Sequence, residues 1–220
     1  KRINISVDEW NVWYQSRYQD VEKITDIDSW PVAPRLLEDS YSVLDAVVFG
    51  NLLISLLKHA DRVTSASLAQ LVNVIAPIMT EPGGDAWRQT TFFPFAVTSR
   101  LAVGSALEVK LVSDTYETAL YGEVALVDAV ATHDPETGMT AIFLVNRSLD
   151  LSTTVTIDIS QLGDVAIIET QTLADDDIHA ANTLADQNRV ALSENASARI
   201  DSGRLTIELP AVSWSAVGLG

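Results

Sequence analysis

The pattern of apolar residues changes character near residue 100, and this change limits the folds that the chain can adopt. Before that point short strand-like runs alternate with long helical runs, whereas the remainder consists almost entirely of short β segments separated by turn residues. Alternating strands and helices are typical of a parallel α/β sheet. Closely spaced short strands are typical of an antiparallel sandwich. We therefore expect an α/β part over residues 1–100 and a β-sandwich over residues 101–220.

The first hundred residues predict two strand–helix units. Residues 3–7 alternate apolar and polar positions, and residues 62–71 have the character of a second strand. Residues 40–59 are too long and too apolar for one strand and predict a helix covered on more than one side. Residues 86–104 predict another helix, kinked or restarted around Pro94. A closed (β/α)8 barrel needs roughly 250 residues, so if these units belong to a barrel, most of it lies elsewhere.

Charge and composition exclude several classes of partner. The 220 residues include 14 basic and 30 acidic side chains, and the net charge of -16 repels phosphate backbones and anionic membrane surfaces. Cysteine is absent, which fits a reducing cytoplasm and rules out thiolate metal sites, and the three histidines lack metal-ligand spacing. With no long apolar run and no leader segment, we expect a cytoplasmic protein without metal, cofactor, nucleic-acid or membrane partner.

Two acidic residues, Asp8 and Glu9, stand between the first apolar run and the tryptophans at positions 10 and 13. Strict alternation places Glu9 on the apolar side of the strand and Asp8 on the other side. At the carboxyl end of a barrel strand either carboxylate would face the mouth of a pocket, and the indole rings would suit the faces of a sugar. The same residues also fit a solvated loop with the tryptophans in the core, which is the commoner outcome for so short a pattern.

The segment ISVDEWNVWY, residues 5–14, resembles the segment that bears the catalytic nucleophile in the family 51 α-L-arabinofuranosidases. The resemblance continues through residues 45–95, and the β-rich remainder is similar in size and texture to the jelly-roll domain of that family. It implies an α/β plus all-β fold, with the C-terminal part of a (β/α)8 TIM barrel followed by a β-sandwich of jelly-roll type. It also implies a homo-oligomeric enzyme that removes terminal α-L-arabinofuranosyl groups with retention of configuration.

Carried over residue by residue, the resemblance makes Glu9 the nucleophile at the end of the seventh barrel strand, with Asp8 as a neighbour that shapes the turn. Gln70 matches a glutamine at the end of the eighth strand that contacts sugar hydroxyls, and its amide can both donate and accept. Trp13 is similar to a tryptophan that lines the pocket near the leaving group. The alternatives are a buried structural amide for Gln70 and a packing role for Trp13.

A retaining mechanism needs a second carboxyl group, which protonates the leaving oxygen and lies about 5 Å from the nucleophile. In the family this acid follows an asparagine on the fourth barrel strand, and Glu38, Glu81 and Glu108 do not match that motif. The resemblance therefore implies that an N-terminal remainder of the same enzyme supplies the acid/base glutamate. The substrate would be an arabinose-containing oligosaccharide or polysaccharide.

Other functions remain open for the sequence. The sandwich could bind carbohydrate without catalysis, although residues 101–220 offer only Tyr116, Tyr121, Phe143 and Trp214 as aromatic side chains, and we expect Trp214 in the sandwich core. The chain could also be a catalytically silent half that supports the barrel or a subunit interface. Among enzymes, a β-xylosidase or an endoglucanase of the same clan is the alternative.

Overall fold

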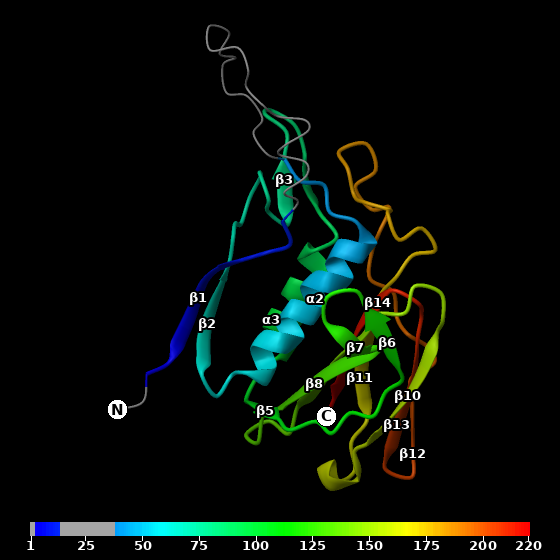
Figure 1. The fold of residues 1–220 in the computed structure, drawn as a ribbon. Coiled ribbons are helices and arrows are strands. Elements are labelled where there is room, and N and C mark those ends of the chain that lie inside the picture. Colours follow the sequence, from blue (N-terminus) through cyan, green and yellow to red (C-terminus); the bar gives the residue numbers. More distant parts are fainter. Residues whose placement is uncertain (1–2, 14–37) are drawn as a thin grey trace, which may run out of the picture.

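The structure, a computed structural model, describes residues 3–13 and 38–220 (Figure 1). It consists mostly of β-sheets with few helices, and its largest sheet has five strands in the order β11-β14-β9-β8-β5. Each neighbouring pair in this sheet is antiparallel. The strands are β5 (Ser105–Leu107), β8 (Val127–His133), β9 (Thr140–Asn146), β11 (Ile167–Leu173) and β14 (Ser213–Leu219).

A three-stranded antiparallel sheet packs on one face of this large sheet. Its strands, in the order β10-β13-β12, are β10 (Thr153–Asp158), β13 (Arg204–Leu209) and β12 (Arg199–Asp201). Leu205, Ile207 and Leu209 recur at every second position of β13, so they point to one side and are fully buried against Ile142 and Leu144 of β9. The period-two pattern of the second half of the chain thus forms a core between two sheets.

Helices α2 (Val43–Lys58) and α3 (Phe92–Leu101) cover the other face of the large sheet (Figure 1). Trp214 of β14 is fully buried on this helix-facing side. A Cβ atom at Gly50 of α2 would lie 2.2 Å from the indole ring, so only glycine permits this approach of helix and sheet. The prediction of Trp214 as a residue of the core between two sheets is therefore wrong, because the ring packs between a sheet and a helix.

Local chemistry explains where the two helices begin. Ser42 caps α2, since its Oγ accepts from the backbone N–H of Asp45 while the Asp45 carboxylate accepts from the Ser42 N–H at 2.7 Å. The sequence predicts a helix kinked or restarted around Pro94. In the structure Pro94 lies in the first turn of α3, where a helix needs no backbone N–H, and the helix continues to Leu101. Residues 86–88, predicted as helix, form a strand instead.

A separate parallel pair, β1 (Ile5–Trp10) and β2 (Val63–Leu68), lies on the side of α2 away from the large sheet (Figure 1). Helix α2 connects the two strands, which gives a β-α-β unit. Trp10 is buried against Phe49 of α2, with ring centroids 4.7 Å apart. Both strands and the helix agree with the elements predicted from the sequence, and the described part of the chain adds no third strand to this sheet.

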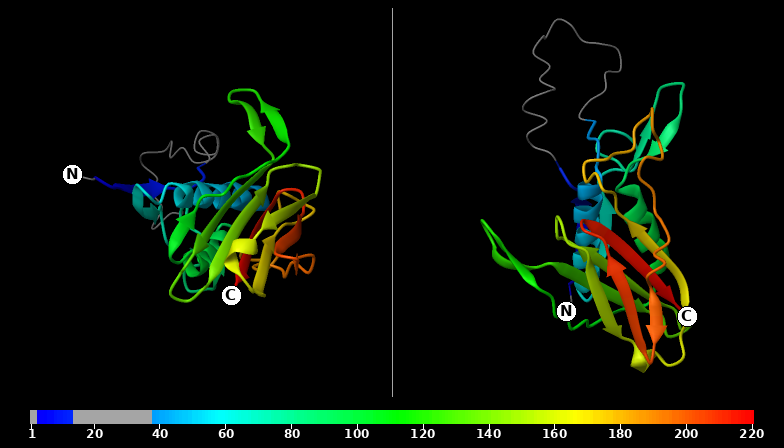
Figure 2. Two further views of the ribbon diagram at one scale, coloured as in Figure 1. Left: turned by 90° about the horizontal axis from the view of Figure 1, so that it is seen from below. Right: turned by 90° about the vertical axis from the view of Figure 1, so that its right-hand side faces the viewer.

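Two hairpins complete the described elements. Strands β3 (Ile78–Thr80) and β4 (Ala86–Arg88) flank the turn at residues 81–84, and β6 (Thr115–Thr118) pairs with β7 (Gly122–Ala125). Figure 2 shows the β6–β7 hairpin projecting from the body of the molecule. A short 3₁₀-helix, η1 (Ser160–Leu162), follows β10. Neither described helix has the length and apolar character that crossing a bilayer requires.

Candidate active site

The three residues singled out in the sequence lie on two segments that follow neighbouring parallel strands. Trp10 of β1 pairs with Leu68 of β2, so Glu9 and Gln70 both lie at the carboxyl ends of this pair. Trp13 follows β1 by three residues. Functional side chains gather at this edge in parallel α/β sheets because the strands end there and the loops diverge.

The side chain of Glu9 is exposed, although strict alternation would place it with the apolar residues. The β1–β2 register shifts between Val7 and Trp10, and both of these residues pack toward α2. The irregularity breaks the period of two, and the Glu9 carboxylate receives no hydrogen bond from residues 3–13 or 38–220. Asp8, in contrast, accepts a hydrogen bond from Ser6 Oγ at 2.6 Å. Both acids are exposed, and they differ in that only the Asp8 carboxylate accepts a hydrogen bond within the described residues.

Gln70 and Trp13 are also accessible. Gln70 is exposed, its Nε2 donates to the Val72 carbonyl at 3.0 Å, and the Ala69–Gln70 peptide bond is cis. The side chain is thus oriented by one bond to its own segment and is not a buried amide. Trp13 is 50% exposed, unlike Trp10, which is buried. The two segments therefore present a carboxylate, an amide and an indole ring at one edge of the sheet.

The sequence analysis missed a bridge between these segments. Asn11 lies midway between Glu9 and Trp13, and its Nδ2 donates to the carbonyl oxygens of Ala69 and Ile75, each at 2.6 Å. Its Oδ1 accepts from the Val12 N–H at 2.8 Å. The side chain uses both of its N–H donors and an acceptor, so it holds the end of β1 against the segment that follows β2.

Tyr41 and Gln89 extend this bridge into the interior. The hydroxyl of the fully buried Tyr41 donates to the Val12 carbonyl at 2.9 Å, and the Tyr41 N–H donates to Gln89 Oε1 at 2.9 Å. Gln89 is buried as well, and its Nε2 donates to the carbonyl oxygens of Asp39 and Ala76. A polar residue inside an aromatic stretch, as Asn11 and Gln89 are in EWNVW and WRQTTFF, is the only signal in the sequence that indicates the partly buried Asn11 and the buried Gln89.

The Asp128 cluster, formed by Asp128, Lys58, Asn51 and Arg147, lies at the C-terminal end of α2, opposite the candidate site. Asp128 pairs with Lys58 and accepts hydrogen bonds from Asn51 Nδ2 at 2.9 Å and an Arg147 guanidinium nitrogen at 3.0 Å. Burial alone would raise the pKa of Asp128, but the bonds from Lys58 and Asn51 outweigh it and leave the pKa below its usual value. This cluster joins the helix to β8 and β9 and serves the fold.

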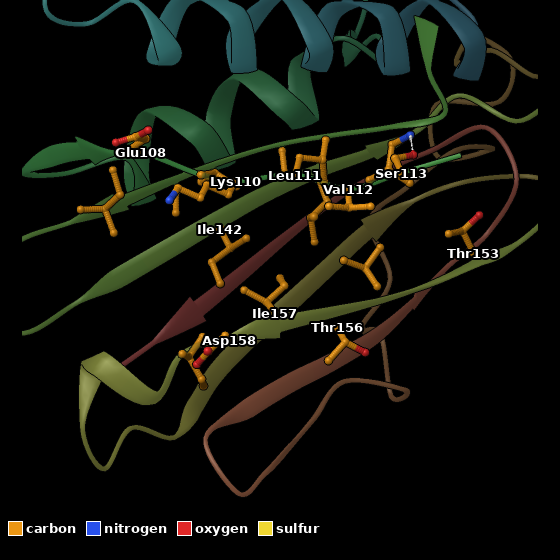
Figure 3. A pocket seen from close by; sticks show the side chains of 18 of the residues that line it. Glu108, Lys110, Leu111, Val112, Ser113, Ile142, Thr153, Thr156, Ile157 and Asp158 are labelled. Atoms are coloured by element: carbon orange, nitrogen blue, oxygen red, sulfur yellow. Dashed lines mark hydrogen bonds between the residues drawn. The ribbon is translucent and has the colours of Figure 1, made fainter. Parts of the chain in front are cut away.

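A hollow of about 990 Å³ lies in the sandwich, at the borders of the two packed sheets (Figure 3). Its walls include Ile142 of β9 and Ile157 of β10, with Glu108, Lys110 and Asp158 among its polar side chains. No residue of β1, β2 or the segments after them lines it. The hollow is therefore separate from the candidate site, and residues 3–13 and 38–220 form no metal-binding group of acidic, histidine or cysteine side chains.

The aromatic residues of the sandwich divide into two groups. Phe143 and Trp214 are buried and stack on each other with centroids 6.3 Å apart. Tyr121 is 83% exposed and Tyr116 is 39% exposed, and both belong to the β6–β7 hairpin region. The accessible rings of residues 101–220 are therefore the two tyrosines of this hairpin.

Comparisons with known proteins agree on one group of enzymes. The family model described as the alpha-L-arabinofuranosidase C-terminal domain matches residues 8–213. An exo-alpha-(1->6)-L-arabinofuranosidase of Bifidobacterium longum is 55% identical over 98% of this chain, and an intracellular exo-alpha-(1->5)-L-arabinofuranosidase of Streptomyces lividans is 52% identical over 99%. The chain spans 41% and 32% of the lengths of these relatives. The solved structure of a family 51 alpha-L-arabinofuranosidase from Bifidobacterium longum matches all of this chain and 42% of its own, with 44% identity and a TM-score of 0.91.

Proposed function

Because the chain belongs to the family 51 α-L-arabinofuranosidases, whose C-terminal portion it matches, we propose that it forms part of a retaining glycosidase that releases terminal α-L-arabinofuranosyl groups. The observation that carries the proposal is the position of Glu9, an exposed carboxylate at the carboxyl end of a parallel strand, beside the segment that bears Gln70. Residues 1–100 are then the last βα units of a (β/α)8 barrel, and residues 101–220 are a jelly-roll sandwich.

Glu9 acts in this proposal as the nucleophile. Its carboxylate attacks the anomeric carbon of the arabinofuranosyl group while the bond to the leaving oxygen breaks, and that oxygen takes a proton from a second carboxylic acid. The product is a glycosyl ester of Glu9. Water then attacks the anomeric carbon, the second residue accepts the proton of that water, and the Glu9 carboxylate is released. Two successive inversions give net retention.

The second carboxyl group comes from an N-terminal remainder of the same enzyme. Two observations support this division. The chain spans 41% of the Bifidobacterium longum relative, and β1 and β2 form a two-stranded parallel sheet, whereas parallel sheets in α/β proteins are larger and closed on both faces. Ile5 of β1 is 45% exposed and Ile3, just before this strand, is 70% exposed, while β2 is the strand that pairs with β1 among the described residues. A barrel completed by the remainder would bring the acid/base glutamate opposite Glu9.

Gln70 and Trp13 contact the substrate. The exposed amide of Gln70 offers a donor and an acceptor to furanose hydroxyls. The half-exposed ring of Trp13 offers a flat apolar surface near the leaving group. A net charge of -16 does not repel a neutral sugar. In this proposal the substrate is an arabinose-containing oligosaccharide or polysaccharide. The enzyme acts on it in the cytoplasm as a homo-oligomer. Relatives from Streptomyces lividans and Bifidobacterium longum are intracellular arabinofuranosidases by name, which supports this location.

The test is the variant Glu9→Ala in the complete polypeptide, assayed with a 4-nitrophenyl α-L-arabinofuranoside. We expect turnover to fall by at least about 1,000-fold, because the covalent route disappears. Added azide should restore cleavage and give the arabinosyl azide of inverted configuration, since the anion replaces the missing carboxylate.

The matched control is Glu117→Gln, which changes an exposed glutamate on the β6–β7 hairpin and should leave turnover unchanged. Near-normal activity of Glu9→Ala would contradict the assignment of the nucleophile. Faster cleavage of the corresponding xyloside or glucoside would favour the β-xylosidase or endoglucanase alternative. If the complete polypeptide neither cleaves nor binds any of these glycosides, the structural alternative holds.

A further inference from the structure

The segment that bears Gln70, residues 69–77, has almost no ladder hydrogen bonds of its own. It leaves β2 at Leu68 and contains turns and bends until β3 begins at Ile78. Side chains from other elements bind its carbonyl groups instead, namely Asn11 at Ala69 and Ile75, and Gln89 at Ala76. The partly buried Asn11 and the buried Gln89 therefore help to set the conformation of this segment, together with backbone bonds such as those from the Ala69 N–H to the Trp10 carbonyl and from the Asp39 N–H to the Val74 carbonyl.

Asn11 also belongs to the other half of the candidate site. It lies two residues after Glu9 and two before Trp13, so one side chain connects the segment with the carboxylate to the segment with the glutamine. The Tyr41 hydroxyl supports the same link, because it donates to the carbonyl of Val12, the residue whose N–H binds Asn11 Oδ1. Asn11 and Tyr41 therefore both bind the backbone of Val12, one at its N–H and the other at its carbonyl group.

From this geometry we propose that Asn11 and Tyr41 are positioning residues, which set the place of Glu9 and Trp13 relative to Gln70. The inference rests on the proposed function. Neither residue touches the substrate, and each acts through the backbone of residues 11–12 and 69–75. A displacement of about 1 Å between reacting groups can lower a rate about 100-fold, so a bridge of this kind affects chemistry even though it lies behind the reacting atoms.

Each residue has a substitution of nearly the same shape that removes the bridging hydrogen bonds. Tyr41→Phe deletes one oxygen atom and keeps the buried ring. Asn11→Asp keeps the size of the side chain, but it replaces two N–H donors by a carboxylate oxygen that faces the carbonyls of Ala69 and Ile75. Tyr121→Phe and Asn4→Asp are the matched controls, since both of these residues are exposed and lie outside the bridge.

The experiment measures kcat and KM of these variants in the complete polypeptide with the 4-nitrophenyl arabinofuranoside. We expect kcat to fall about 10- to 100-fold for Tyr41→Phe and Asn11→Asp, with a smaller change in KM, and no change for the controls. The double variant Tyr41→Phe, Gln70→Ala should lose less than the product of the two single losses, because both changes disturb one geometry.

A residue that only stabilises the fold would lower the unfolding temperature and leave kcat of the folded enzyme unchanged, with multiplicative losses in the double variant. That result would overturn the inference. If Asn11→Asp does not fold, Tyr41→Phe decides the question, since it adds no charge and leaves no cavity of a side chain's size. Wild-type activity of Glu9→Ala would instead remove the proposed function, whereas an inactive Glu9→Ala with fully active Tyr41→Phe and Asn11→Asp would remove this inference alone.

Discussion

The β-sandwich and the β1–β2 pair differ in how far their strands are buried and paired with neighbouring strands. In β14 all seven residues are buried, β9 pairs with it along its whole length, and β11 pairs with it from Trp214 to Leu219. In β1 only Trp10 is buried, and β2 is its single partner among the described strands. Strand residues thus serve stability in the first region and are left accessible in the second. The same separation places the candidate site on the region with the smaller core.

We expect the largest loss of stability when the buried Trp214 is replaced. Trp214→Ala should lower the free energy of unfolding by about 3–5 kcal/mol, because it leaves a cavity between β14 and α2. Trp13→Ala should change it by less than about 1 kcal/mol, since half of that ring is already exposed, yet it should lower activity. Chemical denaturation of both variants in the complete polypeptide gives the comparison, and equal losses of stability would remove the distinction between the two regions.

An intermediate effect is expected at the Asp128 cluster, which links the helix layer to the sandwich. Asp128→Asn should lower the free energy of unfolding by about 1–3 kcal/mol near neutral pH, because Lys58 and Arg147 lose their charged partner. The pKa of Asp128 is lower in the folded than in the unfolded protein. Its contribution is therefore complete above the unfolded pKa and disappears as the pH falls through the folded pKa.

Unfolding of the wild type and of Asp128→Asn should accordingly be compared between neutral and strongly acidic pH. The difference in stability should shrink on acidification. The matched control is Asp164→Asn, which changes an exposed acidic residue in the loop before β11. A difference that grows toward low pH, or one of equal size in the control, would contradict the role assigned to the cluster.

The smallest effect is expected at the hairpin that projects from the sandwich. Tyr121→Ser and Leu120→Ser each change a side chain that is 83% exposed, so each should alter the free energy of unfolding by less than about 0.5 kcal/mol. Loss of stability similar to that of Trp214→Ala would mean that the hairpin packs against another part of the complete protein. Thermal unfolding and size-exclusion chromatography of the two variants would detect this.

The periodic parts of the fold could be predicted from the sequence. The predicted helix at 40–59 and strand at 62–71 correspond to α2 and β2, because their apolar spacing matches the surfaces that they bury. Residues 86–104 were predicted as one helix but contain both β4 and α3. Gln89 lies between those elements, and its Nε2 donates to the Asp39 carbonyl, 50 positions away in the sequence. Hydrogen bonds between residues far apart in the chain produce no periodic pattern of apolar residues, so the sequence does not reveal them.

The candidate site divides in the same way. Glu9, Gln70 and Trp13 were predicted through the resemblance to a family, and in the structure they lie at the carboxyl ends of β1 and β2 or in the segments that follow. Asn11 and Tyr41 were not found, because their importance comes from which carbonyl groups lie opposite them in space. The exposure of Glu9 was also not predictable from alternation, since the register shift in β1 moves the apolar side by one residue.

Helix α2 has apolar contacts on two opposite sides. Phe49 and Leu53 pack toward the β1–β2 pair, while Ala46, Val47 and Ile54 pack toward the large sheet. A hinge between the two regions would have to pull one of these contact surfaces apart and expose it to water. Helix α2 therefore joins the two regions, and the edge that carries Glu9 cannot move relative to the sandwich without exposing apolar surface.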